Sequence, residues 1–241
     1  MRMQALLHLV YPPQCLICDA RVTTDFGLCA TCWRDTPFIT GLTCTKCGLP
    51  LPGQDDAEHV LCDDCLLIAR PWGQGRAALL YGDTARKLVL ALKHGDRIDL
   101  ARPAAQWMKR AAEPILKPDM VVAPVPLHWR RLLKRRYNQA ALLSAGVARL
   151  AGLNHCPDLL QRRHSTGDQD GRTRDGRFAN MADALTVHPK RYHLVEGRHI
   201  LLVDDVMTSG ATLASAAEAC LAIGATGISV VVMARVAKDH Q

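Results

Sequence analysis

Four Cys-x-x-Cys pairs within the first 65 residues constrain the fold of this chain most strongly. They are Cys15/Cys18, Cys29/Cys32, Cys44/Cys47 and Cys62/Cys65. One such pair points two thiolates at one ion, and two pairs complete a tetrahedral zinc shell with Zn–S distances of about 2.3 Å. The eight cysteines therefore predict two structural zinc ions. Sequential pairing along the chain is the simplest arrangement, and an interleaved cross-brace is the alternative.

The cysteine-rich part of the chain is too small to fold on an apolar core. Residues 1–68 are rich in Pro, Gly and Asp, so metal binding would supply their folding free energy. A disulfide framework is the alternative for a chain with ten cysteines, but nothing in the sequence signals export. His59 reads as a loop histidine rather than a substitute ligand, and the isolated Cys156 and Cys220 read as small structural residues.

Composition sets the class of protein. Of 241 residues, 49% are hydrophobic and 5% aromatic, which is enough for a core but few aromatic rings for stacking bases. No apolar run approaches the roughly 18 residues that span a bilayer. Residues 1–10 read as a short helix packed on the body, with a membrane or partner contact as the alternative. We therefore expect a cytoplasmic protein.

Charge and periodicity divide the chain into two parts. Residues 1–75 contain 5 Lys/Arg and 8 Asp/Glu, whereas residues 76–241 contain 25 and 15. A basic domain attracts phosphate groups, whether free or in a nucleic-acid backbone. We predict a double zinc ribbon over 1–68, a linker over 69–75 and a second domain over 76–241.

The second domain alternates strands with helices, which predicts an α/β fold with a parallel sheet and helices on both faces. The predicted strands span residues 76–81, 120–126, 199–203 and 228–234. The predicted helices span residues 84–93, 100–112, 138–150 and 211–223.

The most informative segment is an apolar strand that ends in two carboxylates and a turn of small residues. Asp204 and Asp205 follow the strand, and Thr208–Thr212 (Thr-Ser-Gly-Ala-Thr) opens the next helix. Adjacent carboxylates can accept hydrogen bonds from the two cis hydroxyls of a ribose. The small turn lets backbone N–H groups approach a phosphate at the positive end of a helix. A plain Asp/Thr helix cap, the alternative, does not explain two successive acids.

Residues 200–212 resemble the signature for 5-phosphoribosyl 1-pyrophosphate (PRPP) of type I phosphoribosyltransferases, with Ser209 where that signature usually has Thr. Together with the cysteine pattern, the whole chain resembles the ComF family (ComFC or GntX-like proteins). These are competence-associated double zinc-ribbon phosphoribosyltransferases. Further matches within residues 8–236 are Tyr11–Cys15, Leu92–Asp96, Pro124–His128 and Arg135–Ala140.

The resemblance implies roles for individual residues. Asp204 and Asp205 would bind the ribose hydroxyls with Mg²⁺ nearby, Thr208–Thr212 would hold the 5′-phosphate, and the loop after Val125 would meet the pyrophosphate. The implied catalytic residues are Asp204, Asp205 and Arg135. The implied PRPP-binding residues are Asp204, Asp205, Met207, Thr208, Ser209, Gly210, Ala211, Thr212, Leu127, His128 and Arg136.

Two basic stretches complete the pattern. Arg130–Arg136 places five cations in seven residues and favours a phosphate-facing role over a solvated helix face. Residues 162–183 lack periodicity and resemble the flexible hood of the family, with a plain disordered loop as the alternative. Arg172 and Leu185 stand where the family usually has Leu and Phe, so we expect the loop to close differently.

These features leave three functions open. The first is a PRPP-binding phosphoribosyltransferase that supports DNA uptake in natural transformation and transfers phosphoribose to a nitrogen acceptor. The second is a non-catalytic adaptor for single-stranded DNA or for a DNA-uptake partner, and the third is a PRPP sensor or regulator on the same fold.

Overall fold

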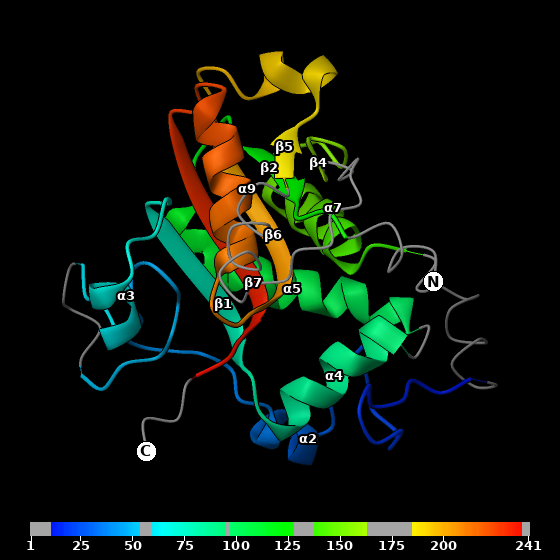
Figure 1. Cartoon of the computed structure of the whole chain (residues 1–241). Coiled ribbons are helices and arrows are strands. Elements are labelled where there is room, and N and C mark those ends of the chain that lie inside the picture. Colours follow the sequence, from blue (N-terminus) through cyan, green and yellow to red (C-terminus); the bar gives the residue numbers. More distant parts are fainter. Residues whose placement is uncertain (1–10, 54–58, 95–96, 128–136, 163–184, 238–241) are drawn as a thin grey trace, which may run out of the picture.

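The computed structural model describes residues 11–53, 59–94, 97–127, 137–162 and 185–237 (Figure 1). The predicted N-terminal helix over residues 1–10 and the basic stretch Arg130–Arg136 lie outside these ranges, as does the predicted hood apart from Arg162. Three residues of the predicted PRPP site, His128, Arg135 and Arg136, are therefore outside the described part of the chain.

The centre of the molecule is a five-stranded parallel sheet with the strand order β1-β7-β6-β2-β3. The strands are β1 (Gln74–Leu80), β2 (Val121–Pro124), β3 (Asn154–His155), β6 (His199–Met207) and β7 (Gly227–Arg235). The inner strands β6 and β7 are apolar and buried along most of their length. Strands covered on both faces read as continuous apolar runs, which is why the sequence reveals them.

Helices cover both faces of this sheet, as predicted. On one face α4 (Asp83–His94), α5 (Ala101–Ala112) and α7 (Gln139–Ala151) bury Leu88, Met108 and Leu143. On the other face α9 (Ala211–Ala222) buries Leu213 and Cys220 against β6 and β7 (Figure 1). None of the helices in the described part of the chain is long and apolar enough to cross a bilayer.

Several short elements were not predicted. β4 (Leu160–Arg162) and β5 (Leu185–Val187) form an antiparallel pair, and the 3-10 helices η1, η2 and η3 span Ile98–Leu100, Glu113–Ile115 and Pro189–Leu194. The cysteine-rich part contains two short helices, α2 (Ala30–Asp35) and α3 (Asp63–Leu67), that were also not predicted. Elements of this length carry too little periodicity to be recognised from sequence.

Strand β6 continues beyond its predicted end at Val203. Its ladder with β7 pairs Asp204 with Val232 and Met207 with Arg235. The prediction of a strand ending at Val203 was wrong because backbone pairing with β7 carries the chain through the two acidic residues. The carboxylates therefore sit on an ordered strand rather than on a loop.

The cysteine-rich part is attached to the edge of the sheet at β1. Ile39 N–H donates to Ala78 O over 3.0 Å, and Gly75 N–H donates to Thr45 O over 2.8 Å. A Cβ on Gly75 would lie 2.3 Å from Lys46 O, so the glycine permits this close backbone approach. The zinc-ribbon part and the sheet thus share backbone hydrogen bonds.

Candidate functional site

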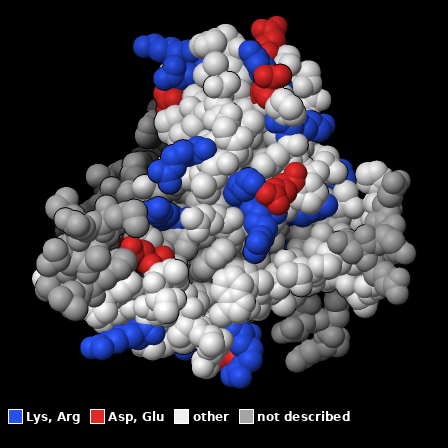
Figure 2. All heavy atoms as spheres, turned by 180° about the vertical axis from the view of Figure 1, so that it is seen from behind, with Lys and Arg blue, Asp and Glu red and all other residues white. Residues whose placement is uncertain are grey.

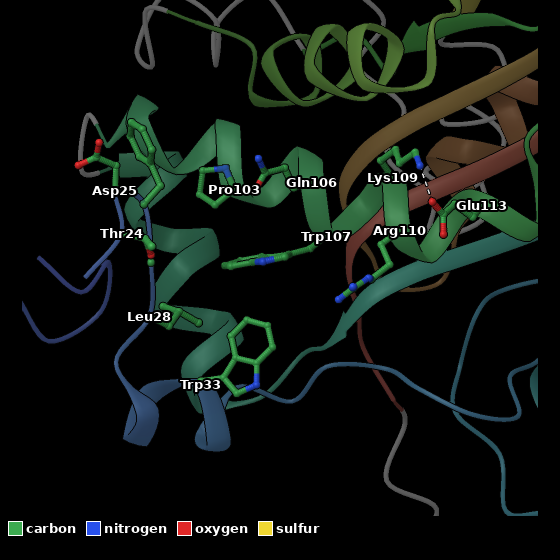
Figure 3. A pocket seen from close by; sticks show the side chains of 12 residues that line it. Thr24, Asp25, Leu28, Trp33, Pro103, Gln106, Trp107, Lys109, Arg110 and Glu113 are labelled. Carbon is green, nitrogen blue, oxygen red and sulfur yellow. Dashed lines mark hydrogen bonds and ion pairs between the residues drawn. The ribbon is translucent and has the colours of Figure 1, made fainter. Parts of the chain in front are cut away.

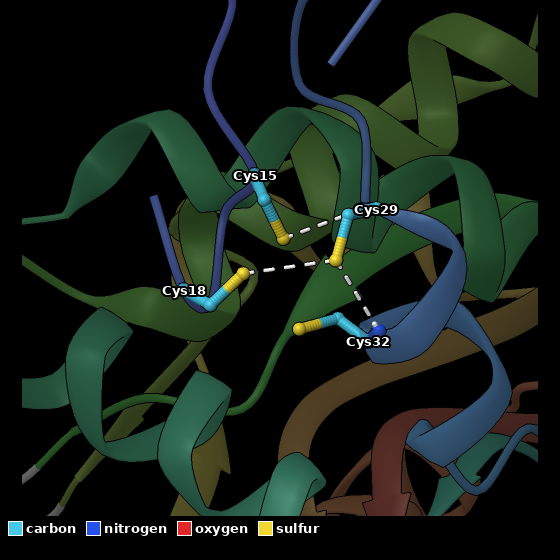
Figure 4. Close-up of side chains that lie close together, drawn as sticks. All are labelled: Cys15, Cys18, Cys29 and Cys32. Carbon is cyan, nitrogen blue, oxygen red and sulfur yellow. Dashed lines mark hydrogen bonds between the residues drawn. The ribbon is translucent and has the colours of Figure 1, made fainter. Parts of the chain in front are cut away.

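The structure divides the eight cysteines of the four pairs into two groups of four. The first tetrad is Cys15, Cys18, Cys29 and Cys32 (Figure 4), and the second tetrad is Cys44, Cys47, Cys62 and Cys65. Within each tetrad the sulfur atoms all lie within 4.8 Å of one another. This is the sequential pairing, and the interleaved cross-brace is ruled out for this structure.

The sulfur geometry fits a tetrahedral ion. Four thiolates at the usual Zn–S distance stand about 3.8 Å apart. The Cys18 and Cys29 sulfur atoms are 3.6 Å apart, and so are those of Cys47 and Cys62. The two tetrads are thus consistent with two structural zinc ions. His59 is exposed and belongs to neither tetrad.

The two tetrads have different surroundings. In the first tetrad Cys18 is exposed and Cys29 and Cys32 are half-buried. All four cysteines of the second tetrad are buried and belong to the same core as Trp72, Met207 and Leu213. A hydrogen bond from Cys47 lowers the pKa of the Cys44 thiol to about 4. The second tetrad is therefore part of the core that lies under α9.

The paired carboxylates lie near the carboxyl end of β6, where open α/β sheets bind ligands. Lys93 Nζ of α4 forms an ion pair with Asp205 Oδ2 over 3.0 Å. Burial and the neighbouring Asp205 carboxylate raise the pKa of Asp204 to about 8, while Lys93 and Arg162 act in the opposite direction. Two carboxyl groups held this close favour a ligand that brings hydrogen-bond donors or positive charge.

Thr208–Thr212, named here the phosphate loop, connects β6 to α9. Thr208 and Ser209 are exposed, and Gly210 adopts a left-handed conformation with φ 79° directly before α9 begins. Gly210 has no side chain to cap this helix, and Ser209 Oγ accepts a long hydrogen bond from Ala211 N–H over 3.4 Å. The first turn of α9 therefore presents backbone N–H groups, with the positive end of the helix dipole, beside the carboxylates.

A second loop approaches the carboxylates from the neighbouring strand β2. Val125 N–H donates to Val203 O over 2.9 Å, which places the start of this loop beside the end of β6. Asn138 caps α7 through Ala140 N–H and donates from Nδ2 to Val125 O over 3.2 Å. Leu127, half-buried, is the last described residue before the predicted pyrophosphate contacts.

Two residues near the carboxylates were missing from the predicted site. The first, Lys93, lies in the run Leu92–Asp96, which matched the family pattern but was given no role. The end of α4 that carries Lys93 is held by Tyr137, whose hydroxyl donates to Leu92 O over 2.7 Å. Arg162 donates from Nε to Pro126 O over 3.1 Å, so it joins β4 to the second loop. The sequence signal for Lys93 was its place in this short run of small and charged residues.

A groove of about 500 Å³ lies between residues 24–33, which include part of the first tetrad, and α5 (Figure 3), and neither Asp204 nor Asp205 lines it. Trp33 and Trp107 face it together with Arg110, and Phe38 connects the two indoles with ring centroids 4.6 and 5.3 Å away. Trp33 is 50% exposed. The groove combines aromatic faces with two cations, Lys109 and Arg110, and two carboxylates, Asp25 and Glu113, of which Glu113 pairs with Lys109.

Charge on the face opposite to that of Figure 1 is dispersed. Figure 2 shows Lys and Arg side chains in several separate places, with Asp and Glu between them. Within the described residues on this face, the positive charge of the second domain does not form one continuous patch.

Comparison with known proteins identifies both parts of the chain. Residues 6–66 match the Double zinc ribbon domain family, and residues 165–241 match the Phosphoribosyl transferase domain family. These matches confirm the predicted resemblance.

Three relatives span nearly the same length. The chain is 28% identical over 229 residues to the DNA utilization protein YhgH of Escherichia coli K12, covering 92% of this chain and 96% of that protein. It is 28% identical to Competence protein F of Haemophilus influenzae, covering 87% of this chain and 90% of that protein. It is 25% identical to Competence protein ComFC of Bacillus subtilis, covering 87% of this chain and 89% of that protein. Among solved structures it is similar to the glutamine PRPP amidotransferase from B. subtilis at 18% identity and a TM-score of 0.42, over 60% of this chain and 30% of that one.

Proposed function

Because the chain joins a double zinc ribbon to a phosphoribosyltransferase domain, as in the ComF family that it resembles, we propose that it binds PRPP at the carboxyl end of β6. The observation that carries the proposal is the placement of Asp204 and Asp205 on β6 directly before a loop whose Gly210 turns the chain into α9. One edge of the sheet thus offers acceptors for sugar hydroxyls and donors for a phosphate.

The residues divide the ligand between them. Asp204 and Asp205 accept hydrogen bonds from the ribose hydroxyls, and Lys93 holds the Asp205 carboxylate through its ion pair. Thr208–Thr212 bind the 5′-phosphate through backbone N–H groups and hydroxyls. Leu127, after β2, flanks the sugar, whereas the side chain of Met207, at the end of β6, is buried in the core. We assign contacts with the pyrophosphate to His128, Arg135 and Arg136, which are outside the described residues.

A Mg²⁺ ion fits this arrangement as a companion of the pyrophosphate. Carboxylate oxygens and phosphate oxygens are the ligands that Mg²⁺ prefers, and it is usually bound jointly by protein and substrate. The raised pKa of Asp204 reflects burial and the neighbouring Asp205 carboxylate, and a further cation beside Asp204 would favour its ionised form. The ion, when bound, would neutralise charge on the leaving pyrophosphate.

The reaction that this site supports is transfer of phosphoribose to a nitrogen nucleophile. A bond forms between that nitrogen and ribose C1, the bond from C1 to the pyrophosphate oxygen breaks, and pyrophosphate leaves with the electron pair. The nitrogen then loses a proton to solvent. Asp204 and Asp205 fix the ribose while positive charge develops at C1, and Arg135 would stabilise the leaving group, so catalysis rests on positioning and electrostatics.

The biological setting that we propose is DNA uptake in the cytoplasm of a naturally transformable cell. Relatives that match over 87% or more of the chain carry the names DNA utilization protein and Competence protein. The names alone support this setting.

Titration calorimetry with PRPP and Mg²⁺ tests the binding site. We expect saturable binding by the wild type and at least a tenfold loss of affinity in Asp204→Asn/Asp205→Asn, because each lost hydrogen bond to a charged group is worth about 1.5–3 kcal/mol. Asp158→Asn, which removes a carboxylate paired with Arg191 on the surface, is the matched control. Equal affinity in all three proteins would refute the site, and a pyrophosphate-release assay with candidate amines then decides whether binding leads to transfer.

The groove lined by Trp33, Trp107 and Arg110 favours a second function, an adaptor for single-stranded DNA. Aromatic faces that stack bases beside cations that contact phosphates are the usual means of binding single strands. Anisotropy of a labelled oligonucleotide should then rise with protein and fall steeply with salt. Trp33→Ala should weaken binding about tenfold, and unchanged binding would exclude the groove.

A further inference from the structure

Two arginine side chains, the half-buried Arg70 and the buried Arg235, connect the phosphate loop to the second tetrad. Arg70 follows Cys65 in the chain by five residues, and Arg235 ends β7 with 1% of its surface exposed. Neither was assigned a role from the sequence. Arginine is rarely buried unless its charge and donors find partners, so the partners of these two residues indicate what they do.

On one side, both guanidinium groups donate to backbone carbonyls at the start of the phosphate loop. Arg70 Nη1 donates to Ser209 O. Arg235 Nη1 donates to Thr208 O over 2.8 Å and approaches Met207 O at 3.4 Å. Three consecutive carbonyl groups are therefore directed toward arginine.

This arrangement also sets the direction of the neighbouring N–H groups. In a planar trans peptide unit the C=O and the N–H of the next residue point in opposite directions. Because the carbonyls of Met207, Thr208 and Ser209 face the arginines, the N–H groups of Thr208, Ser209 and Gly210 face the other way. That is the side on which an anion can accept from them.

On the other side, the same arginines meet the second tetrad. Arg70 stands five residues after Cys65, and the Trp72 indole beside its guanidinium donates to the carbonyl of Lys46, between Cys44 and Cys47. Arg235 Nη2 also lies 3.7 Å from Asp64 Oδ2 in α3, the helix that carries Cys65. Each arginine keeps a buried Nε without a hydrogen-bond partner among the described residues.

The orphaned donors fit a metal-loaded tetrad. Four thiolates around Zn²⁺ carry a net charge of −2, which is costly to bury without nearby positive charge. Two guanidinium groups with spare N–H donors supply that charge. The first tetrad, by contrast, is partly exposed. Leu16, next to its Cys15, packs into the core on the opposite face of the sheet.

Trp72 completes the connection. Its indole Nε1 donates over 2.6 Å to the carbonyl of Lys46, which lies between Cys44 and Cys47. Lys46 Nζ donates back to Trp72 O over 2.6 Å. The Arg70 guanidinium lies 5.5 Å from the centre of the indole ring. A Cβ on Gly210 would stand 3.2 Å from the same indole, so ring, arginine and loop are in contact.

From these contacts we infer that Arg70 and Arg235 are positioning residues that hold the phosphate loop in its binding shape on the second tetrad. The loop then depends on the metal bound by Cys44, Cys47, Cys62 and Cys65, and it is independent of the metal bound by the first tetrad. The inference rests on the proposed function for the ligand that the loop takes, but the support of the loop by the tetrad can be tested without that ligand.

Hydrogen exchange of the ligand-free, zinc-loaded full chain, followed by mass spectrometry, tests the support directly. Arg70→Gln should speed exchange of the amides in residues 208–214 about tenfold, since it removes one hydrogen bond to the loop. Arg70→Lys, which keeps a donor, should restore part of the protection. Arg191→Gln, a surface arginine paired with Asp158, is the matched control and should change nothing in this segment. Unchanged exchange in Arg70→Gln would overturn the inference.

A second pair of variants separates the two tetrads. Cys62→Ser and Cys18→Ser each remove one ligand, and only Cys62→Ser should speed exchange in residues 208–214. Equal effects of both, or no effect of Cys62→Ser with its zinc lost, would contradict the dependence on the second tetrad. If Cys62→Ser does not fold, the Arg70 variants still decide the question because Arg70 is half-buried and lies outside the tetrad.

Calorimetry with PRPP and Mg²⁺ on the same proteins then connects support to binding. Arg70→Gln should bind PRPP about tenfold more weakly than the wild type. If the wild type binds no PRPP, the proposed function fails while the exchange result still stands. If the wild type binds and Arg70→Gln binds equally well, the positioning role fails instead.

Discussion

Lys93 Nζ lies 3.0 Å from Asp205 Oδ2, and both side chains are largely buried, with 20% and 12% of their surfaces exposed. The pair joins α4 to β6, two elements that lie more than a hundred residues apart in the chain. The Tyr137 hydroxyl donates to Leu92 O beside it, so the end of α4 is held in place. A fixed cation thus stands next to the two carboxylates that we assign to the ribose.

Replacing this cation should weaken PRPP binding. Lys93→Met keeps the length of the side chain but leaves Asp205 unpaired, so the Asp205 carboxylate repels Asp204 and the ligand's negative charge more strongly. We expect about a tenfold loss of affinity in calorimetry. Lys109→Met, which breaks a surface pair with Glu113 instead, is the matched control and should bind normally. Equal affinities of the two variants would remove Lys93 from the site.

Gly210 is expected to tolerate no side chain. Its φ is 79°, and a Cβ would stand 2.8 Å from Arg70 Nη1 and 3.2 Å from Trp72 Cη2. Gly210→Ala should therefore cost about 1–3 kcal/mol of unfolding free energy and also lower PRPP affinity.

The control for this substitution is Gly152→Ala at the end of α7. Gly152 has a φ of 67° with nothing within 4 Å of its Cβ position, so it carries the conformational strain without the contacts. Gly152→Ala should lower the free energy of unfolding by about 1 kcal/mol and leave PRPP binding normal. Denaturant unfolding and calorimetry measure both effects, and a smaller loss at Gly210 than at Gly152 would contradict the packing of the loop.

The stability of the ligand-free protein should depend on Asp204 in a predictable direction. Burial and Asp205 raise its pKa to about 8 in the folded state, above the ordinary value near 3.8 of the unfolded chain. The folded state therefore binds the extra proton, and the stability from this group is present below pH 4 and is lost as pH rises to about 8.

Asp204→Asn cannot take part in this titration. It should raise the thermal midpoint relative to the wild type, by an amount that grows from pH 5 to pH 8 and corresponds to about 1–2 kcal/mol at the upper end. Thermal unfolding across this range checks it. A difference that shrinks with rising pH would show that Asp204 is stabilised as the carboxylate.

Zinc should leave the chain in two phases. The first tetrad exposes Cys18, whereas the second is buried throughout, so a chelator reaches the first ion sooner. Zinc release followed with a metal-binding dye should give one fast and one slow equivalent per chain, with helix content lost mainly in the slow phase. Cys18→Ser should remove the fast phase alone, and a single phase for the wild type would contradict the difference in burial.

Much of this arrangement could be predicted from sequence because the signals were local. A Cys-x-x-Cys pair defines its own knuckle, so the two tetrads followed from spacing, although only the structure decided between sequential and interleaved pairing. The inner strands β6 and β7 were evident from continuous apolar runs, and α9 from its small residues after Gly210.

What could not be predicted depends on contacts between distant segments. Arg235 follows an apolar strand and looks like an ordinary charged end, yet it is buried because Asp64 and the loop carbonyls lie around it. Trp72 lies in a segment that reads as a linker, yet its indole is buried against Lys46. The pairing of β4 with β5 joins segments separated by more than twenty residues of unpatterned chain.

A crystal structure of the zinc-loaded protein with PRPP and Mg²⁺ tests the central claim most directly. We predict a phosphate on the N–H groups of Thr208–Thr212, the two ribose hydroxyls on Asp204 and Asp205, and the pyrophosphate toward the loop after Val125. PRPP bound elsewhere, for instance in the groove of Trp33 and Trp107, with the carboxylates of β6 free of ligand, would contradict the account.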